Sequence, residues 1–288
     1  MLQTDYDPPS PREWQDCAPL GRGRDSAPIG RDMELLREGA RVLGLHLTAE
    51  HVRAFQIYYR ELGAWNRKFN LTTVTRCEEV QLKHFLDSLT CLLALPVPGA
   101  DRDKRLPNVV PLSSKETPLL CIDVGTGAGF PGLPVKILRP ALHMTLLESA
   151  RKKITFLEHV VKCLGLESVK TLWARAEEAG QDAHHRERYD VVLARAVADL
   201  AVLVEYCLPL CRKGGCFIAQ KGAEVEAELK RAEAATNLLG GKLREVKTLH
   251  LPGLKELRSL VLIDKVGRTP AKYPRRPGIP SKQPITGE

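Results

Sequence analysis

The chain lacks any run of about 20 consecutive apolar residues, the length needed to cross a bilayer. Its first residues also lack the basic segment followed by an apolar one that marks a secretion signal. Acidic residues occur there at five positions, Asp5, Asp7, Glu13, Asp16 and Asp25. Because organelle transit peptides are poor in acids, we expect a cytoplasmic protein that is neither inserted in a membrane nor exported.

The cysteines lack the spacing of a metal site. There are eight of them but no CxxC unit, and the closest group, Cys207, Cys211 and Cys216, has no paired histidine. Most lie inside apolar stretches of a chain that is long enough to bury a core without disulfides. We therefore predict buried, reduced thiols and no metal ion.

Acidic residues are outnumbered by basic ones. The 288 residues include 43 Lys and Arg against 35 Asp and Glu, a formal net charge of +8. Part of the excess lies near the C-terminus, where six basic residues and no acidic one occur between Lys265 and Lys282. Such clustering favours a polyanionic partner such as nucleic acid, without identifying one.

Composition and periodicity divide the chain into five parts. In the second part, Val52, Phe55 and Leu62 belong to a stripe of apolar residues at steps of three and four, which predicts a helix. A second stripe predicts another helix over about 79–95. The parts are an extension expected to be flexible (1–31), a helical cap (32–95), a proline-rich loop (96–118), an α/β domain (119–265) and a basic tail (266–288).

Beyond the loop, short apolar runs alternate with helical stretches, the pattern of a parallel sheet wrapped by helices. Seven runs predict strands, over 119–124, 143–148, 169–173, 189–195, 215–221, 243–251 and 258–264. The last two are separated by only a few residues, so the final strand should enter antiparallel, by a hairpin. This is the α/β, Rossmann-like architecture of class I methyltransferases, a seven-stranded sheet preceded here by the helical cap.

A glycine-rich turn follows the first strand. Residues 123–132 read DVGTGAGFPG, in which glycines let a nucleotide-like ligand approach the backbone closely. The same glycines also satisfy the GxGxxG of nicotinamide dehydrogenases, which therefore remain an alternative. Asp123 favours S-adenosylmethionine instead. Two residues before Gly125, its carboxylate can accept from the ammonium of a methionine moiety, whereas it would repel a pyrophosphate.

Charged residues end two of the following strands and lie shortly after a third. Glu148 can bind both ribose hydroxyls of either cofactor. Ala176, Glu177 and Glu178 follow the third strand, where class I enzymes hold adenine, although acids are also common at helix N-termini. Arg195 ends the fourth strand at the edge where ligands of open sheets bind, so that it contacts cofactor or substrate, or is simply an exposed strand end.

The motifs of two classes of methyl acceptor are missing. Methylation of an exocyclic amine usually requires Asn or Asp with Pro-Pro-aromatic after the fourth strand, where residues 194–197 read ARAV. Methylation of a pyrimidine carbon needs a cysteine nucleophile, and none is well placed. A ring nitrogen with a lone pair, such as guanine N7, needs only positioning against the methyl group. A carboxylate or imidazole acceptor would also meet this condition.

Six stretches of the chain resemble the RsmG (GidB) family of 16S ribosomal RNA guanine-N7 methyltransferases. They are residues 65–72, 83–88, 122–132, 177–178, 194–196 and 220–222. The resemblance covers about residues 32–285 and implies S-adenosylmethionine as methyl donor and one guanine N7 of the small ribosomal subunit as acceptor. The extension and the insertion at 101–117 lie outside the family pattern. The motif and the resemblance together predict cofactor contacts at Asp123, Gly125, Gly127, Phe130, Glu148, Ser149, Ala150, Ala176, Glu177 and Arg195.

Contacts to RNA are predicted at four residues, His84, Lys221, Arg275 and Arg276. No general base is needed, so Arg195 and Lys221 are the predicted positioning residues. Asn70 and Asp87 are candidates to face RNA or to lock the cap onto the sheet, but a local structural role is favoured for both, because such side chains often bond nearby backbone at turns and helix edges. We expect a monomer whose partner is 16S rRNA or the small subunit. The alternatives are a methyltransferase for another RNA and a ribosome-associated RNA-binding protein that only senses the cofactor.

Overall fold

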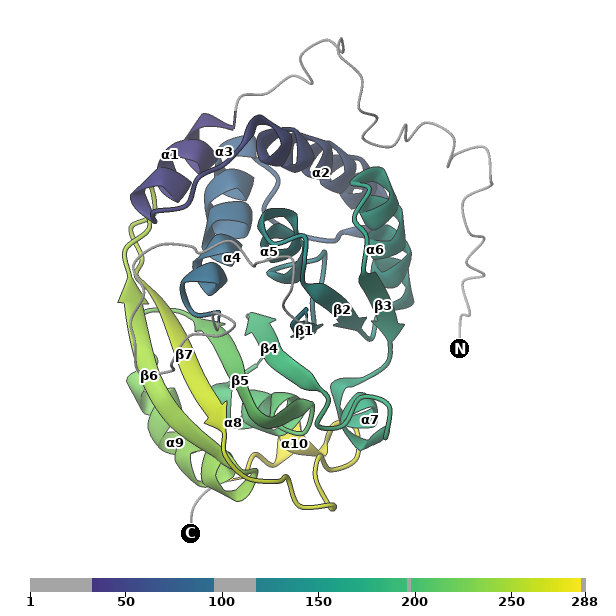
Figure 1. Ribbon diagram of the computed structural model, residues 1–288, viewed down its shortest axis with the longest axis vertical. Helices are drawn as coiled ribbons and strands as arrows, with labels where there is room; N and C mark the ends of the chain where they lie inside the picture. The colour runs from purple at the N-terminus through teal and green to yellow at the C-terminus, as the bar shows by residue number, and fades with distance from the viewer. Residues whose placement is uncertain (1–32, 96–117, 196–197, 286–288) are drawn as a thin grey trace.

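The computed structural model describes residues 33–95, 118–195 and 198–285 (Figure 1). The extension predicted over 1–31 and most of the loop predicted over 96–118 lie outside the described residues. None of the helices within the described ranges is long and apolar enough to span a membrane.

A seven-stranded sheet in the order β3-β2-β1-β4-β5-β7-β6 forms the centre of the molecule (Figure 1). Its strands are β1 Leu120–Val124, β2 His143–Glu148, β3 Val169–Trp173, β4 Tyr189–Arg195, β5 Cys211–Lys221, β6 Gly241–Leu249 and β7 Arg258–Lys265. The first five are parallel, and β7 lies antiparallel between β5 and β6. The predicted class I fold, with its terminal hairpin, is confirmed.

The cap begins with two helices, α1 Glu34–Val42 and α2 Ala49–Phe69. Thr48 starts α2, since its hydroxyl accepts from the backbone N–H of His51 and the His51 ring accepts in return from the Thr48 N–H, both at 3.2 Å. Asn70 ends α2 in the left-handed conformation, with φ of 48°. The local structural role predicted for Asn70 is thereby confirmed.

The second predicted cap helix is one helical stretch with changing geometry. It runs as α3 Cys77–Glu79, a π-helix over Val80–Leu86, α4 Asp87–Leu89 and a 3₁₀ turn over Thr90–Leu93. π-Helical turns are uncommon and occur frequently at functional sites. This one faces the ends of β4 and β5, as described below.

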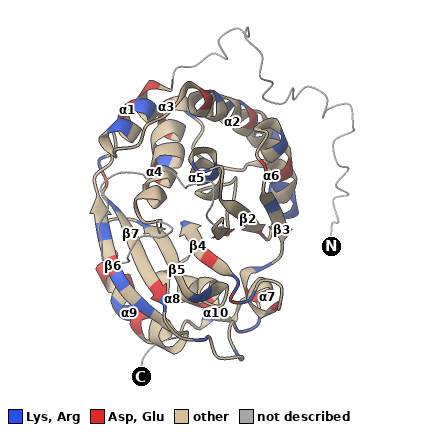
Figure 2. Cartoon of the chain, in the orientation of Figure 1, with Lys and Arg blue, Asp and Glu red and all other residues tan. Residues whose placement is uncertain are grey.

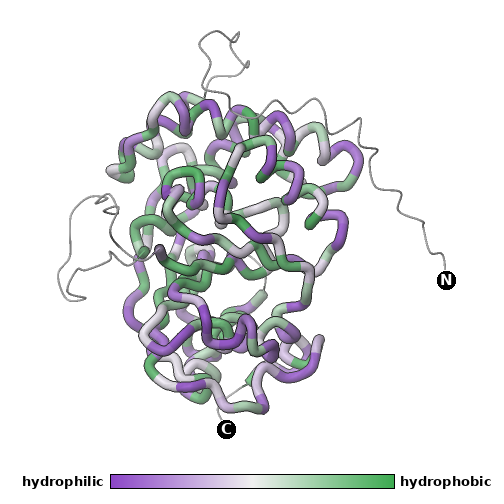
Figure 3. The backbone as a smooth tube through the Cα atoms, turned by 45° about the vertical axis from the view of Figure 1, so that its right-hand side comes forward, coloured by the Kyte–Doolittle hydropathy of each residue, from purple (hydrophilic) through white to green (hydrophobic). Residues whose placement is uncertain are grey.

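Helices cover both faces of the sheet. They are α5 Gly132–Leu138, α6 Arg151–Cys163, α7 Ala176–Gln181, α8 Leu200–Cys207, α9 Glu226–Leu238 and α10 Ile279–Lys282. In β4, Val191 and Leu193 pack in a core with the cap, α5 and α6, whereas Val192 and Ala194 pack in a second core with α7, α8 and α9. This is the two-residue alternation of a strand buried on both faces. The apolar segments concentrate accordingly in the interior (Figure 3).

The cap therefore shares its core with the sheet. Phe55, Tyr58 and Phe85 are fully buried, in the same cluster as Leu146 and Leu193 of the strands. Burying an aromatic side chain of this size contributes on the order of 2 kcal/mol or more. The boundary between cap and catalytic domain stays a prediction from the sequence.

The described part of the basic tail folds back on α7 and α8. Tyr273 is buried, and Gln181 donates to the carbonyl of Pro274 at 2.8 Å. Arg186 donates to the carbonyl of Tyr273 at 2.7 Å. Lys265, the last residue of β7 and the one before the tail, is buried and donates to the carbonyl of Leu208 at 2.9 Å. These contacts make the segment up to residue 285 part of the fold.

Candidate cofactor-binding site

The glycines of the turn after β1 serve different neighbours. A Cβ at Gly127, whose φ is +63°, would have one neighbour within 4 Å, the Gly125 carbonyl oxygen at 4.0 Å, so the space beside this position is left for a ligand. A Cβ at Gly129 would lie 2.5 Å from the Tyr58 hydroxyl, and one at Gly132 would lie 2.8 Å from the Asp123 carboxylate. The missing side chain of Gly129 thus leaves room for Tyr58 of the cap, and that of Gly132 leaves room for Asp123. Gly127 is the position suited to a cofactor.

Asp123 is fully buried beneath this turn. Its Oδ2 accepts from the Thr126 hydroxyl at 2.5 Å and from the Gly132 N–H at 2.7 Å. Its Oδ1 is buried without a hydrogen-bond partner among the described residues. Burial raises the pKa of Asp123 to about 6, against the opposing effects of these two hydrogen bonds and of the Arg195 charge. An orphaned acceptor at this position fits a ligand that brings a donor, such as an ammonium group.

Glu148, at the end of β2, connects the glycine turn after β1 to the residues that follow β2. Its Oε1 accepts from the N–H groups of Ser149 and Ala150, both at 2.9 Å, and its Oε2 accepts from the Gly127 N–H at 3.0 Å. The carboxylate therefore lies next to the open position at Gly127. It has lone pairs left for ribose hydroxyls, as the sequence predicts.

The two acids after β3 face other parts of the protein. Glu178 accepts from the backbone N–H of Arg175 at 3.0 Å, which is a helix-capping contact. Glu177 is buried and accepts from the Gly278 N–H at 2.9 Å. The side chain of Glu177 is therefore anchored to the C-terminal segment through Oε1, and the cofactor contacts predicted for Ala176 and Glu177 stay predictions.

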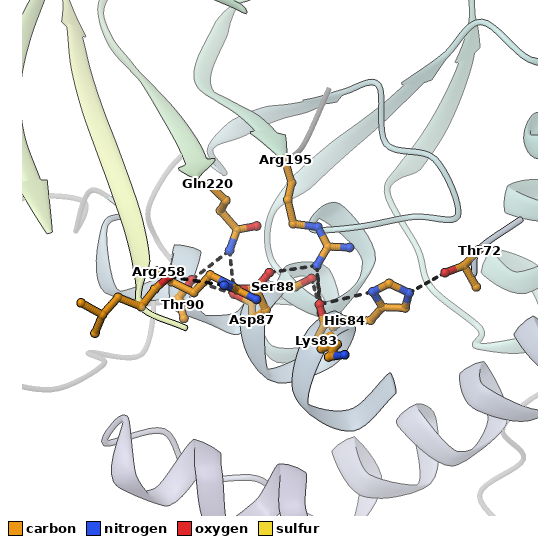
Figure 4. A network of polar contacts seen from close by, with 10 residues as sticks. Thr72, Lys83, His84, Asp87, Ser88, Thr90, Arg195, Gln220 and Arg258 are labelled. Carbon is orange, nitrogen blue, oxygen red and sulfur yellow. Dashed lines mark hydrogen bonds and ion pairs between the residues drawn. The ribbon is translucent and has the colours of Figure 1, made fainter. Parts of the chain in front are cut away.

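Arg195 joins the end of β4 to the cap (Figure 4). Its Nη1 donates to the carbonyl of Lys83 at 3.0 Å and to Oδ2 of Asp87 at 3.2 Å. Its guanidinium also lies over the Phe130 ring, 5.0 Å from the centroid. Arg195 is therefore no exposed strand end: the structure fixes it between the cap and the cofactor turn. Asp87 locks the cap onto the sheet, which was one of its expected roles, although the favoured one was a local structural role.

Phe130 leads from the glycine turn into an aromatic cluster. Its ring stacks on Tyr58 at 5.2 Å and on His84 at 4.6 Å between centroids, and the residue is buried. The Tyr58 hydroxyl donates to the carbonyl of Ala128 at 2.5 Å. The structure places Phe130 against the cap, and its predicted cofactor contact stays a prediction.

His84 belongs to this cluster through the π-helix. Its Nε2 lies 2.8 Å from the Thr72 hydroxyl. Burial, followed by the charge of Arg195, lowers the pKa of His84 to about 4. A neutral, stacked imidazole has no charge with which to attract a phosphate. The predicted RNA contact of His84 is therefore a prediction that this geometry does not favour.

Lys221, predicted to neutralise a phosphate or a carboxylate, already has partners. Its Nζ lies 2.6 Å from Oε2 of Glu228 and donates to the carbonyl of Ala198 at 2.8 Å. Glu228 also accepts from the Leu200 N–H at 2.8 Å. The structure thus gives Lys221 the role of joining β5 to α8 and α9, and its predicted RNA contact stays untested.

The two arginines predicted to face RNA differ in environment. Arg275 donates to Glu205 from Nη2 at 2.6 Å and from Nε at 2.9 Å, and Glu205 is fully buried. The pair raises the pKa of Arg275 further, mainly through its hydrogen bond to Glu205. Arg276 is exposed. Of the two, only Arg276 has the exposure that an RNA contact requires.

Two residues near the site were not singled out from the sequence. Gln220, at the end of β5, donates from Nε2 to the carbonyl of Asp87 at 2.6 Å and to the Thr90 hydroxyl at 2.9 Å (Figure 4). Arg258 of β7 lies 3.2 Å from Oδ1 of Asp87, close enough for an ion pair although the angle is not that of a hydrogen bond. The sequence signal that could have identified Gln220 is a polar residue at the end of an apolar strand.

The structure has free, buried thiols, as expected, at six positions, Cys77, Cys91, Cys121, Cys207, Cys211 and Cys216. The prediction of reduced thiols is wrong at Cys163, whose sulfur takes part in a disulfide bond. One buried group of the described residues, Glu61, His159 and Cys163, brings three potential ligand atoms within 4.8 Å of one another. Glu61 is paired there with Arg60 and with His159 at 2.7 and 2.8 Å. The expected absence of a metal ion stays a prediction.

Known proteins match this chain over most of its length. The family model of the rRNA small subunit methyltransferase G family matches residues 51–100 and 106–260. Ribosomal RNA small subunit methyltransferase G of Pelotomaculum thermopropionicum is 49% identical over 252 residues, which are 88% of this chain and 98% of that protein. The protein of the same name from Roseiflexus castenholzii is 50% identical over 88% of this chain and 99% of its own.

Solved structures match more loosely. A 16S rRNA (adenine(1408)-N(1))-methyltransferase from Catenulisporales acidiphilia aligns with a TM-score of 0.41 and 14% identity, over 53% of this chain and 87% of that one. The sequence matches decide the assignment and confirm the family resemblance inferred from the motifs. The chain belongs to the rRNA small subunit methyltransferase G family.

Proposed function

We propose that this protein transfers the methyl group of S-adenosylmethionine to N7 of a guanine in the 16S rRNA of the small ribosomal subunit. The observation that carries the proposal is the cradle formed by Gly127, Glu148 and Asp123, in a chain of this family. Gly127 has only the Gly125 carbonyl oxygen near its missing side chain, Glu148 offers acceptor oxygens beside it, and Asp123 presents a buried oxygen without a partner among the described residues. A ribosomal substrate agrees with the cytoplasmic location expected from the sequence.

When bound, S-adenosylmethionine supplies an electrophilic methyl group on a sulfonium. Guanine N7 carries its own lone pair, so the protein does not have to remove a proton and contributes positioning instead. Asp123 suits an ammonium group, and Glu148 suits vicinal hydroxyls. Arg195, held by Asp87 and by the carbonyl of Lys83, fixes the end of β4 against the cap, where an acceptor would be positioned.

Transfer of labelled methyl tests the proposal. Small subunits purified from cells that lack this activity are incubated with the protein and labelled S-adenosylmethionine, and the rRNA is digested to nucleosides. We expect label in 7-methylguanosine. Gly127→Val provides the control, because its side chain fills the open position and should abolish both cofactor binding and labelling.

Two other outcomes have distinct meanings. Label in another nucleoside would show that the acceptor atom is not guanine N7, although the protein would still be an RNA methyltransferase. Cofactor binding by the wild-type protein without any labelled nucleoside would overturn the proposal in favour of a protein that only senses the cofactor.

A further inference from the structure

One large aromatic side chain is exposed at the cofactor edge of the sheet. Trp173 is the last residue of β3 and pairs in register with Glu148 of β2. It is 57% exposed, although tryptophan is highly buried on average. The other large apolar side chains of α6, β3 and α7 that the structure describes are not exposed. Trp173 therefore stands alone, without the apolar surroundings of a protein-docking patch.

The indole of Trp173 is held in place despite its exposure. Its Nε1–H donates to the carbonyl of Ser149 at 2.9 Å. The guanidinium carbon of Arg151 lies 4.8 Å from the ring centroid, a cation–π distance. A ring fixed in this way loses little conformational freedom when a partner binds. The arrangement is a rigid platform.

Basic residues flank this platform, together with one exposed acid, Glu178, which accepts from the Arg175 N–H. Arg151, Lys152 and Arg175 are exposed, and within the described ranges none of them forms an ion pair. Figure 2 shows basic residues on α6 beside β3. The first turn of α6 contains no acidic residue, although acids would stabilise it better than these cations do. Helix stability therefore does not explain this charge.

We propose that Trp173, with Arg151 against its ring and Arg175 two residues further along the chain, is a stacking site for an unpaired base of the RNA substrate. Exposed aromatic rings beside cations are the usual means of holding single-stranded RNA. The strand order places β3 three strands from β4, which corresponds to about 14 Å. At the roughly 3.4 Å per nucleotide of a stacked strand, the stacked base would lie about four nucleotides from the acceptor guanine. This inference rests on the proposed function, because it assumes an RNA substrate at the same edge of the sheet.

Tryptophan fluorescence and RNA affinity test the site. The probe is an rRNA fragment that contains the acceptor guanine, titrated into the full-length protein. We expect the fragment to quench the wild-type fluorescence and Trp173→Phe to lose that quenching while keeping most of the affinity. Trp173→Ala should weaken binding by roughly 5- to 100-fold, the effect of losing one stacked base. Arg175→Gln should lower the slope of log affinity against log salt by about 0.7 and keep the quenching.

Affinity for S-adenosylmethionine, measured by calorimetry, is the control readout. Equal cofactor affinity in wild type, Trp173→Phe and Trp173→Ala is expected. Loss of cofactor affinity in Trp173→Ala with unchanged RNA affinity would overturn the proposal, because Trp173 would then be a wall of the cofactor pocket. Wild-type RNA affinity and quenching independent of Trp173 would overturn it as well. Either result could coexist with normal methyl transfer by the wild type, so the two proposals fail separately.

Discussion

Arg195 and Asp87 form an ion pair across the contact between sheet and cap, with Nη1 of Arg195 3.2 Å from Oδ2 of Asp87. Only 13% and 7% of the two side chains are exposed. Removing one partner of a buried pair leaves the other charge uncompensated. We therefore expect Asp87→Asn to lower the free energy of unfolding, by about 2 to 4 kcal/mol. The loss is limited because Arg195 keeps the carbonyl of Lys83 as a hydrogen-bond acceptor. Urea unfolding measures this difference.

Glu38→Gln is the matched control for that variant. Glu38 pairs with Arg41 at 2.8 Å on the exposed side of α1. Such exposed pairs are screened by solvent and contribute little to stability, so this change should leave the unfolding midpoint almost unchanged. Equal effects of the two substitutions would show that the contact between cap and sheet does not depend on Asp87.

Cofactor binding should depend on pH through Asp123. Its pKa is raised to about 6 by burial, whereas an unfolded Asp titrates near 3.9. The ligand-free folded state therefore favours the protonated form, and stability is lost as the pH rises from about 4 through 6. An ammonium group favours the carboxylate. We expect affinity for S-adenosylmethionine, measured by calorimetry, to fall by up to about tenfold per pH unit below pH 6.

Asp123→Asn isolates this group, because it keeps the shape of the side chain but does not titrate. The variant should bind the cofactor more weakly at pH 7.5 and show no step near pH 6. A step that persists in Asp123→Asn would assign the titration to another residue.

His84 should make the protein less stable in acid. Its pKa is lowered to about 4 by burial and by the charge of Arg195, so it is neutral in the folded state at neutral pH. An unfolded histidine takes up a proton near pH 6.5. Stability is therefore complete above that pH and is lost as the pH falls toward 4, by at most about 1.4 kcal/mol per unit.

Urea unfolding at pH 7.5 and pH 5 tests this expectation. His84→Gln removes the titrating group and should lose less stability between the two pH values than the wild type does. His143→Gln, at an exposed position, should keep the wild-type dependence. Parallel curves for the wild type and His84→Gln would contradict the expectation.

The neighbouring arginines of the C-terminal segment should behave differently. Arg275→Ala leaves the carboxylate of fully buried Glu205 without its partner, which should destabilise the fold by about 3 to 5 kcal/mol. Arg276→Ala removes an exposed charge and should leave stability unchanged. Thermal unfolding, together with binding to the rRNA fragment, separates the two roles. Reduced RNA affinity with unchanged stability in both variants would restore the interpretation of the tail as an RNA-binding segment.

The strands and the cofactor cradle could be predicted because their signals are local. Buried parallel strands are continuous apolar runs, and Glu148 and Arg195 follow such runs directly. The contacts of Tyr58 with Ala128 and of Gln220 with Asp87 could not be predicted, since they join residues 70 and 133 positions apart. Which residues meet in such contacts depends on how the cap packs against the sheet, and the periodicity of the sequence does not indicate this.

The role of the tail was hidden for a similar reason. Its cations indicate a solvated or RNA-binding segment as long as the partner of Arg275 is unknown. That partner, Glu205, lies inside the apolar helix α8. A carboxylate in such a helix signals a buried cation, but the sequence does not say which one.

The contacts of Asp87 that join the cap to the sheet also affect the order in which the chain folds. The cap is synthesised first, yet Asp87 meets its partners only after residues 195, 220 and 258 have emerged from the ribosome. Contacts over such separations form slowly, and until then apolar cap surfaces remain open to chaperones and proteases. The last third of the polypeptide thus determines when the first third becomes ordered.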